Sequence, residues 1–181
     1  MTFEEKTLKE NIIFKGRIIT VKNDKVLLPN GKEAGREVVM HNGGVCVAVL
    51  TKENEILMVK QFRYPYKEEL LEIPAGKLEK GEDPYQAGLR ETEEETGVKP
   101  KVLHSLGAFY PTVAYCDEVI HMYYADEFET AKQHLDEDEF LSCDKIKLDD
   151  AVKMILNGEI KDGKTQAAVL KLAMLKGVKC E

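Results

Sequence analysis

Carboxylates are concentrated between residues 91 and 95, where the chain reads Glu91-Thr92-Glu93-Glu94-Glu95. If this stretch is helical, Glu91, Glu94 and Glu95 stand at positions i, i+3 and i+4 and share one face. Like charges placed in this way repel each other by roughly 0.2–0.5 kcal/mol per pair. A divalent cation would reverse that cost, because hard cations prefer carboxylate oxygens. An isolated acidic run is more often a solvated helix face, so its context decides.

The residues on either side of the run predict a helix over residues 84–96. Asp83 is a good N-cap, and Pro84 suits the first helical position. Gln86 stands where the partner in a capping box belongs. Gly97 supplies the left-handed residue with which many helices end.

The spacing around this helix, G-x5-E-x7-R-E-x2-E-E-x-G followed by an aliphatic residue, resembles the Nudix box of the Nudix hydrolases. Thr92 is the one loose point, because an aliphatic residue is commoner there. In that family the box forms a loop, a helix and a loop that hold divalent metal against a diphosphate. The fixed positions are matched by Gly76, Glu82, Arg90, Glu91, Glu94, Glu95, Gly97 and Val98.

Length and composition agree with one domain of an enzyme of this kind. The chain has 181 residues and a net charge of −7, without a basic patch or arm, so we expect no nucleic-acid partner. No apolar run reaches the ~18 residues that span a membrane, so we expect no membrane partner. The four cysteines show no metal-type pairing, and we expect free thiols in a cytoplasmic protein.

The fold class that we expect is α/β (α+β). Residues 1–42 read as strands with a hairpin turn at Pro29-Asn30-Gly31, and form an N-terminal antiparallel β-hairpin unit. The resemblance implies a Nudix fold, a mixed β-sheet sandwiched between helices, over residues 43–181.

Within that second part, the apolar runs 45–50 and 56–59 are expected as two central strands of one mixed sheet. Further strands are expected over 103–109 and 118–125. Two helices are expected in the C-terminal part: one begins at Asp149 or Asp150 and stops at Gly158, and the other covers residues 165–176.

Two segments before the box are typical of the ADP-ribose pyrophosphatases of the Nudix family: Gln61-Phe62-Arg63 and Glu72-Ile73-Pro74-Ala75-Gly76. The resemblance implies that Arg63 contacts substrate and that the carbonyl of Ala75 is a metal ligand. One loop departs from the subgroup, because Thr112-Val113-Ala114 stands where Ser-Pro-Gly is usual. Thr112 can still donate a hydrogen bond to phosphate or ribose.

The resemblance also implies the metal site and the base. Mg²⁺, with Mn²⁺ as the alternative, would be bound by the Ala75 carbonyl and by Glu91, Glu94, Glu95 and Glu139. In similar proteins a glutamate of the acidic loop 136–139 is the catalytic base, so Glu139 is the first candidate and Glu137 the second. If neither is the base, it lies elsewhere and Glu94 is the candidate within the box.

Four other residues have roles implied by the resemblance. Glu82 and Arg90 look like a structural pair across the loop, helix and loop. Arg36 and Glu37, on the N-terminal hairpin, resemble positions that bind substrate from the partner subunit in related dimers, and solvated strand charges are an equally good interpretation. Strands that are apolar on both faces need a second surface, so we expect a homodimer built largely through residues 1–40.

The function expected from these features is Mg²⁺-dependent hydrolysis of ADP-ribose to AMP and ribose 5-phosphate. The alternative within the class is another nucleoside diphosphate derivative, such as a nucleotide sugar or a dinucleotide polyphosphate. A ligand sensor or scaffold without turnover is a different class, and such modules usually lose the box carboxylates that this chain keeps.

Overall fold

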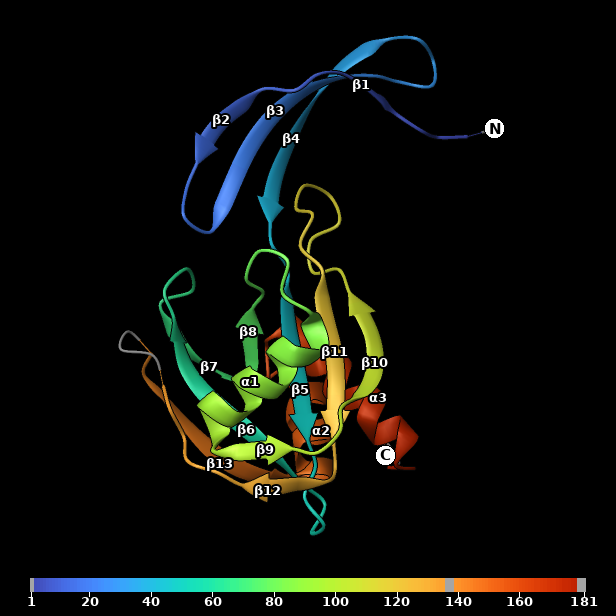
Figure 1. The fold of residues 1–181 in the computed structure, drawn as a ribbon. Coiled ribbons are helices and arrows are strands. Elements are labelled where there is room, and N and C mark those ends of the chain that lie inside the picture. The colour runs from blue at the N-terminus through green and yellow to red at the C-terminus, as the bar shows by residue number, and fades with distance from the viewer. Residues whose placement is uncertain (1, 136–138, 179–181) are drawn as a thin grey trace. The chain divides into compact units, whose positions relative to one another are not determined.

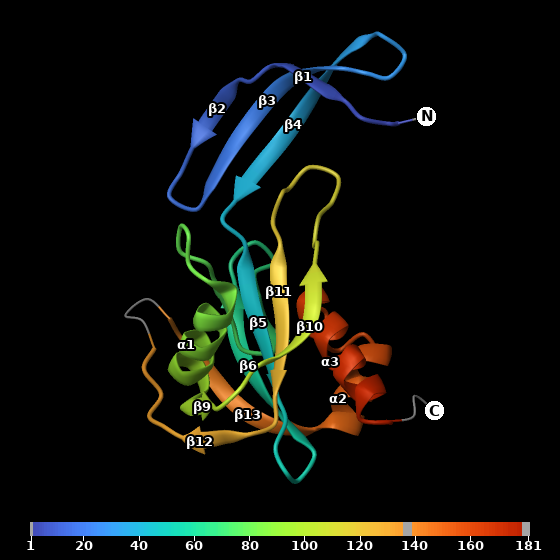
Figure 2. The same cartoon turned by 45° about the vertical axis from the view of Figure 1, so that its right-hand side comes forward.

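Residues 2–135 and 139–178 are described by a computed structural model, in which the chain forms two units (Figures 1 and 2). The first unit takes the chain up to Gly43 and adds Tyr110–Val119. The second unit takes Gly44–Phe109 and continues from Ile120 onward. No helix in the described ranges is long and apolar enough to cross a membrane.

The first unit is an antiparallel sheet in which β3 pairs with each of the other three strands. The predicted turn after β3 is confirmed, because the amide of Gly31 donates to the carbonyl of Leu28 at 2.9 Å. Gly31 has a φ of 80°, in the left-handed region that favours glycine. The strands are β1 (Lys6–Lys9), β2 (Ile12–Lys15), β3 (Ile19–Leu27) and β4 (Glu33–His41).

Residues 110–119 belong to this first unit, although they connect two strands of the second one. Val39 of β4 donates its amide to the carbonyl of Tyr115 at 2.7 Å, and its carbonyl accepts from the amide of Asp117 at 3.0 Å. The Asp117 carboxylate in turn accepts the amide of His41 at 2.7 Å. The loop that carries Thr112 is therefore fixed by backbone hydrogen bonds to β4.

The second unit contains a mixed four-stranded sheet in the order β10-β11-β5-β8, with β11 and β5 parallel, and an antiparallel sheet β13-β6-β7. A short antiparallel pair, β9 and β12, completes it. The strands are β5 (Gly44–Val49), β6 (Glu55–Arg63), β7 (Glu68–Glu72), β8 (Ala75–Lys77), β9 (Val98–Pro100), β10 (His104–Phe109), β11 (Ile120–Ala125), β12 (Phe128–Thr130) and β13 (Leu141–Lys147).

The prediction that the runs 45–50 and 56–59 share one sheet is wrong. Both runs are strands, but β5 and β6 lie in different sheets, and an isolated β-bridge joins Leu50 to Ile56. The reason is that both edges of β5 are already occupied, by β11 on one side and β8 on the other.

Strand β5 is buried on both faces, and this explains its continuous apolar sequence. Cys46 and Ala48 pack into the core formed with α2 and α3, while Val47 and Val49 face the cluster that includes side chains of α1. Figure 2 shows α1 and α3 on opposite sides of β5. The mixed sheet therefore lies between helices, as predicted. The helices are α1 (Pro84–Thr96), α2 (Leu148–Leu156) and α3 (Gly163–Leu175).

The two C-terminal helices form, but each begins earlier than predicted. Helix α2 starts at Leu148, so Asp149 and Asp150 lie in its first turn, where the helix dipole favours carboxylates, and neither caps it. Helix α3 starts at Gly163, because the Asp162 side chain accepts the amide of Thr165 and caps the helix.

Candidate active site

Helix α1 forms over the predicted residues and for the predicted reasons. Asp83 accepts the amide of Gln86 at 3.0 Å, Pro84 opens the helix, and Gly97 ends it with a φ of 65°. Thr92, the loose position of the box, is fully buried, and its hydroxyl donates to the carbonyl of Gly88 at 2.7 Å. This internal bond allows a polar residue where an aliphatic one is commoner.

Glu91 and Glu95 lie against the strand that precedes the box. Glu95 is 2% exposed and accepts the amide of Ala75 at 2.9 Å. Glu91 crosses over Gly76 so closely that a Cβ at Gly76 would lie 1.9 Å from the Glu91 carboxyl carbon. A glycine is therefore required at position 76 for the Glu91 carboxylate to stay beside the Ala75 backbone.

Arg90 neutralises part of the acidic face. Its guanidinium lies 2.9 Å from Glu91 and 2.8 Å from Glu94, and 3.2 Å from Glu82 in the loop before the helix. The contact with Glu82 connects the loop to the helix, while the contacts with Glu91 and Glu94 offset their mutual repulsion.

The negative charges of Glu91 and Glu95 are only partly compensated by the groups around them. Burial raises the pKa of Glu91 to about 7, although Arg90 acts in the opposite direction. Burial raises the pKa of Glu95 to about 8 against the hydrogen bond from Ala75. Glu139 adds to both shifts through its negative charge, so its half-buried carboxylate lies close to the pair.

The donors at this position suit a hard divalent cation. Carboxylates whose neutral forms are favoured by burial become fully charged when a cation replaces their protons. Among the described residues, however, no three acidic, His or Cys side chains already converge as a metal cage. Arg90 instead contacts one carboxylate oxygen of Glu91 and one of Glu94.

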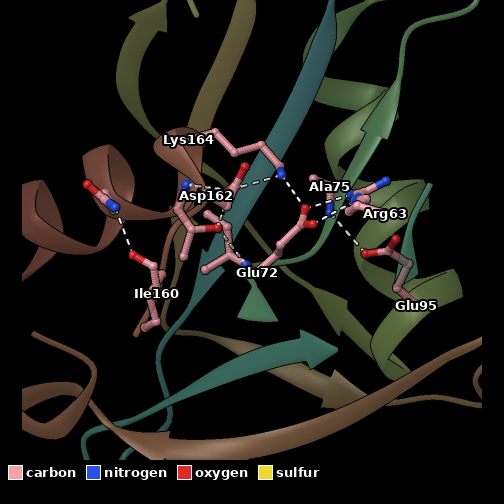
Figure 3. Close-up of polar contacts among 10 residues, drawn as sticks. Arg63, Glu72, Ala75, Glu95, Ile160, Asp162 and Lys164 are labelled. Carbon is pink, nitrogen blue, oxygen red and sulfur yellow. Dashed lines mark hydrogen bonds and ion pairs between the residues drawn. The ribbon is translucent and has the colours of Figure 1, made fainter. Parts of the chain in front are cut away.

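A second charged cluster lies beside the box and was not predicted. Glu72 is 1% exposed, and both of its oxygens accept from Arg63, at 2.6 Å each. Lys164 also donates to Glu72 and lies 3.0 Å from Asp162 (Figure 3). Burial raises the pKa of Glu72, but Arg63 and Lys164 outweigh it and the net shift is downward.

The cluster adjoins the box carboxylates. Arg63 and Glu95 are near enough for each to favour the charged form of the other. Figure 3 shows Arg63 and Lys164 reaching Glu72 from different sides, with Ala75 and Glu95 next to Arg63. The structure thus brings predicted residues Arg63, Ala75, Glu91, Glu95 and Glu139 to one place.

The other predicted substrate residues lie in the first unit. Arg36 forms a bidentate ion pair with Glu5, with distances of 2.8 and 2.5 Å, and Glu37 is exposed on β4. Thr112 is half-buried in the loop bound to β4. Their role in substrate binding stays a prediction. Glu137 lies outside the described residues.

Comparisons with known proteins identify the family of the chain. The NUDIX domain matches residues 40–168, and the nucleoside diphosphate sugar hydrolase N-terminal domain matches residues 5–39. The chain therefore belongs to the Nudix family, as its box predicts. Its similarity to ADP-ribose pyrophosphatases places it with the ADP-ribose pyrophosphatase type of Nudix hydrolase.

Two relatives match over almost their whole length. The chain is 43% identical to an ADP-ribose pyrophosphatase of Bacillus subtilis, covering 99% of this chain and 98% of the relative. It is 44% identical to a methanol dehydrogenase activator of Bacillus methanolicus, covering 98% and 97%. A solved structure described as an ADP compounds hydrolase has the same fold, with a TM-score of 0.83 at 17% identity and 97% coverage of each chain.

The first prediction concerns protons and metal at Glu91 and Glu95. Their contribution to the free energy of unfolding is complete below their ordinary pKa of 4.5 and is lost as the pH rises through the folded values of about 7 and about 8. A divalent cation takes the place of these protons, so Mg²⁺ should raise the Tm more at a pH of about 8.5 than at about 6.

Thermal unfolding of the wild type and of Glu95→Gln, with and without Mg²⁺ at both pH values, measures this effect. The variant should lose most of the pH-dependent part of the Mg²⁺ stabilisation. An equal rise in Tm at both pH values in the wild type would contradict the prediction.

Proposed function

We propose that this chain is a Mg²⁺-dependent hydrolase that cleaves the diphosphate of ADP-ribose to give AMP and ribose 5-phosphate. The observation that supports it most directly is the position of Arg63 beside the buried Glu95, which stands one helical turn after the half-buried Glu91. A diphosphate is bound well by the N–H donors of a guanidinium together with a divalent metal, and an arginine and carboxylates that could hold such a metal lie together here. The substrate follows from the similarity to the B. subtilis relative over 99% of the chain.

Each residue of the site has a part in the proposed reaction. The carboxylates of Glu91, Glu95 and Glu94, with the Ala75 carbonyl and Glu139, would bind Mg²⁺ or Mn²⁺. The metal, when bound, offsets phosphate charge and makes a water more acidic. Arg63 orients the diphosphate through hydrogen bonds. Hydrolysis forms one bond from a water oxygen to phosphorus and breaks the bond from that phosphorus to the bridging oxygen.

Glu139 is the proposed base that removes the proton from the attacking water. Its carboxylate lies close enough to Glu91 and Glu95 to raise the pKa of both. Because Glu139 comes from the segment before β13 and not from α1, its position can respond to bound substrate independently of the box. Glu137 stays the second candidate.

A nucleotide sugar is the second candidate substrate. Residues 5–39 match the N-terminal domain of nucleoside diphosphate sugar hydrolases, and the loop at Thr112 lacks the Ser-Pro-Gly of the ADP-ribose subgroup. Steady-state kinetics on ADP-ribose, a nucleotide sugar and a dinucleotide polyphosphate, with product analysis, separate these substrates. Absence of turnover on all three at saturating Mg²⁺ would favour the ligand sensor.

Glu95→Gln should lower kcat at least about 100-fold, because it removes a metal charge from a site whose shape is retained. The matched control is Glu93→Gln on the same helix, since Glu93 is half-exposed and its closest cation is Lys99 at 3.8 Å. Circular dichroism establishes that both variants fold. Near-normal turnover in folded Glu95→Gln would show that Glu95 is not a metal ligand.

Glu139→Gln should lower kcat by roughly 100-fold or more while Mg²⁺ still raises the Tm, because a base acts on the water and is not needed for folding. Glu137→Gln, tested alongside, should have the smaller effect. If Glu137→Gln is the more damaging, the base is Glu137. If both variants turn over normally, Glu94 becomes the candidate.

We also propose that the protein is a homodimer in which residues 1–42 supply much of the interface and Arg36 and Glu37 lie near the partner's site. Ile12, Ile13, Phe14 and Ile18 are 45–59% exposed on the first unit, which is a large apolar surface for a monomer. Sedimentation of the full-length chain at micromolar concentration should give twice the monomer mass. A fully active monomer would refute this arrangement.

A further inference from the structure

Lys164 is a buried cation that no step of the proposed reaction uses. Its side chain is 11% exposed, and its ammonium group contacts the carboxylates of Glu72 and Asp162. A buried ammonium group loses its hydration, and it is kept in a protein interior when it is paired in a defined geometry. The contacts of Glu72, one of the two partners of Lys164, indicate the role of this buried lysine.

Glu72 is held from two sides. Its Oε1 accepts from Nε of Arg63 and its Oε2 accepts from Nη2 of Arg63, both at 2.6 Å, in the parallel fork that a carboxylate forms with a guanidinium. Oε2 also accepts from Nζ of Lys164. Rotation of the Glu72 side chain would break its hydrogen bonds to both Arg63 and Lys164. Lys164 therefore helps to fix the orientation of the carboxylate plane that accepts from Arg63.

One edge of the Arg63 guanidinium stays available. Nε and Nη2 are used by Glu72, whereas Nη1 donates to no acceptor within residues 2–135 and 139–178. The Arg63 side chain is 35% exposed, while Glu72 and Lys164 are almost fully buried. The guanidinium therefore has one edge held by Glu72, while Nη1 could donate to an anion, and Glu95 lies nearby.

Helix α3 supports the same segment through a second bond. Thr165 accepts the amide of Ile73, the residue after Glu72, at 3.0 Å, and donates to Asp162 at 2.6 Å. The first turn of α3 thus holds both the Glu72 side chain and the backbone that leads to Ala75.

We propose that Lys164 is a positioning residue, which holds the Glu72 carboxylate so that Arg63 presents its Nη1 edge to the diphosphate of the substrate. This role rests on the proposed function for the identity of the substrate. It predicts that Lys164 affects substrate binding only through Arg63.

A mutant cycle tests this dependence. Lys164→Met should raise KM for ADP-ribose roughly tenfold, the loss expected for a misplaced charged hydrogen bond, with a smaller change in kcat. In an Arg63→Gln background, Lys164→Met should raise KM no further. The matched control is Lys161→Met, which removes an exposed lysine that pairs with Glu68 at 2.8 Å and should leave KM unchanged. Equal effects of Lys164→Met in both backgrounds would overturn the proposal.

A second readout requires neither substrate nor metal. The Nε–H signal of Arg63 in a ¹⁵N-labelled protein, assigned by its loss in Arg63→Gln, should shift or broaden in Lys164→Met and stay unchanged in Lys161→Met. An unchanged Arg63 signal in Lys164→Met would overturn the positioning role. If Lys164→Met does not fold, Lys164→Gln, which loses the charge and keeps a donor, is taken through the same measurements.

The two readouts separate this role from the proposed substrate. If the wild type does not hydrolyse ADP-ribose but the Arg63 signal responds to Lys164→Met, the substrate assignment fails and the coupling of Lys164 to Arg63 is supported. The mutant cycle is then measured on the substrate of the panel that is hydrolysed, with the same expected loss of effect in Arg63→Gln.

Discussion

The placement of the buried Glu95 beside the half-buried Glu91 is the constraint on which the arrangement of the site depends. Glu95 lies in the last turn of α1, where the helix dipole is unfavourable for a carboxylate and adds to the cost of burial. The Ala75 amide and the Arg90 guanidinium offset part of this cost. The pKa values of about 7 and about 8 show that the compensation is incomplete, so the folded chain favours an added positive charge at this position.

Strand β5 determines where the carboxylates of Glu91 and Glu95 lie. Its pairing with β8 places Gly76 opposite Val45 and Ala75 opposite Cys46, and both of these β5 residues are buried in the core. The backbone before the box is therefore an edge strand of a packed sheet and not a free loop. Because Gly76 has no side chain, the Glu91 carboxylate can lie directly on this strand. The carboxylates are thus fixed by the core as well as by their own helix.

Features encoded by neighbouring residues could be predicted from the sequence, and features set by distant residues could not. Asp83 and Gly97 define α1 because capping is local. The contact of Glu72 with Lys164 joins residues 92 positions apart, and an ion pair has no periodicity by which to recognise it. The one available signal was a lysine in the first turn of a helix, two residues after the capping aspartate. Likewise, the separation of β5 from β6 depends on which strands fill the edges of β5, which their apolar sequences do not specify.

In the proposed reaction, the two charged clusters would contribute differently to binding a diphosphate. Arg63 and Lys164 carry two positive charges, and Glu72 and Asp162 carry two negative charges, so the sum over this cluster is zero. It can orient an anion through the open edge of Arg63, but it provides little net attraction at a distance. The box carboxylates repel a diphosphate unless a cation neutralises them. In the proposed reaction, affinity for the substrate would therefore come largely from a cation held at Glu91 and Glu95, while Arg63 would orient the diphosphate. The precise placement of its guanidinium through Glu72 would then decide how well the substrate is oriented.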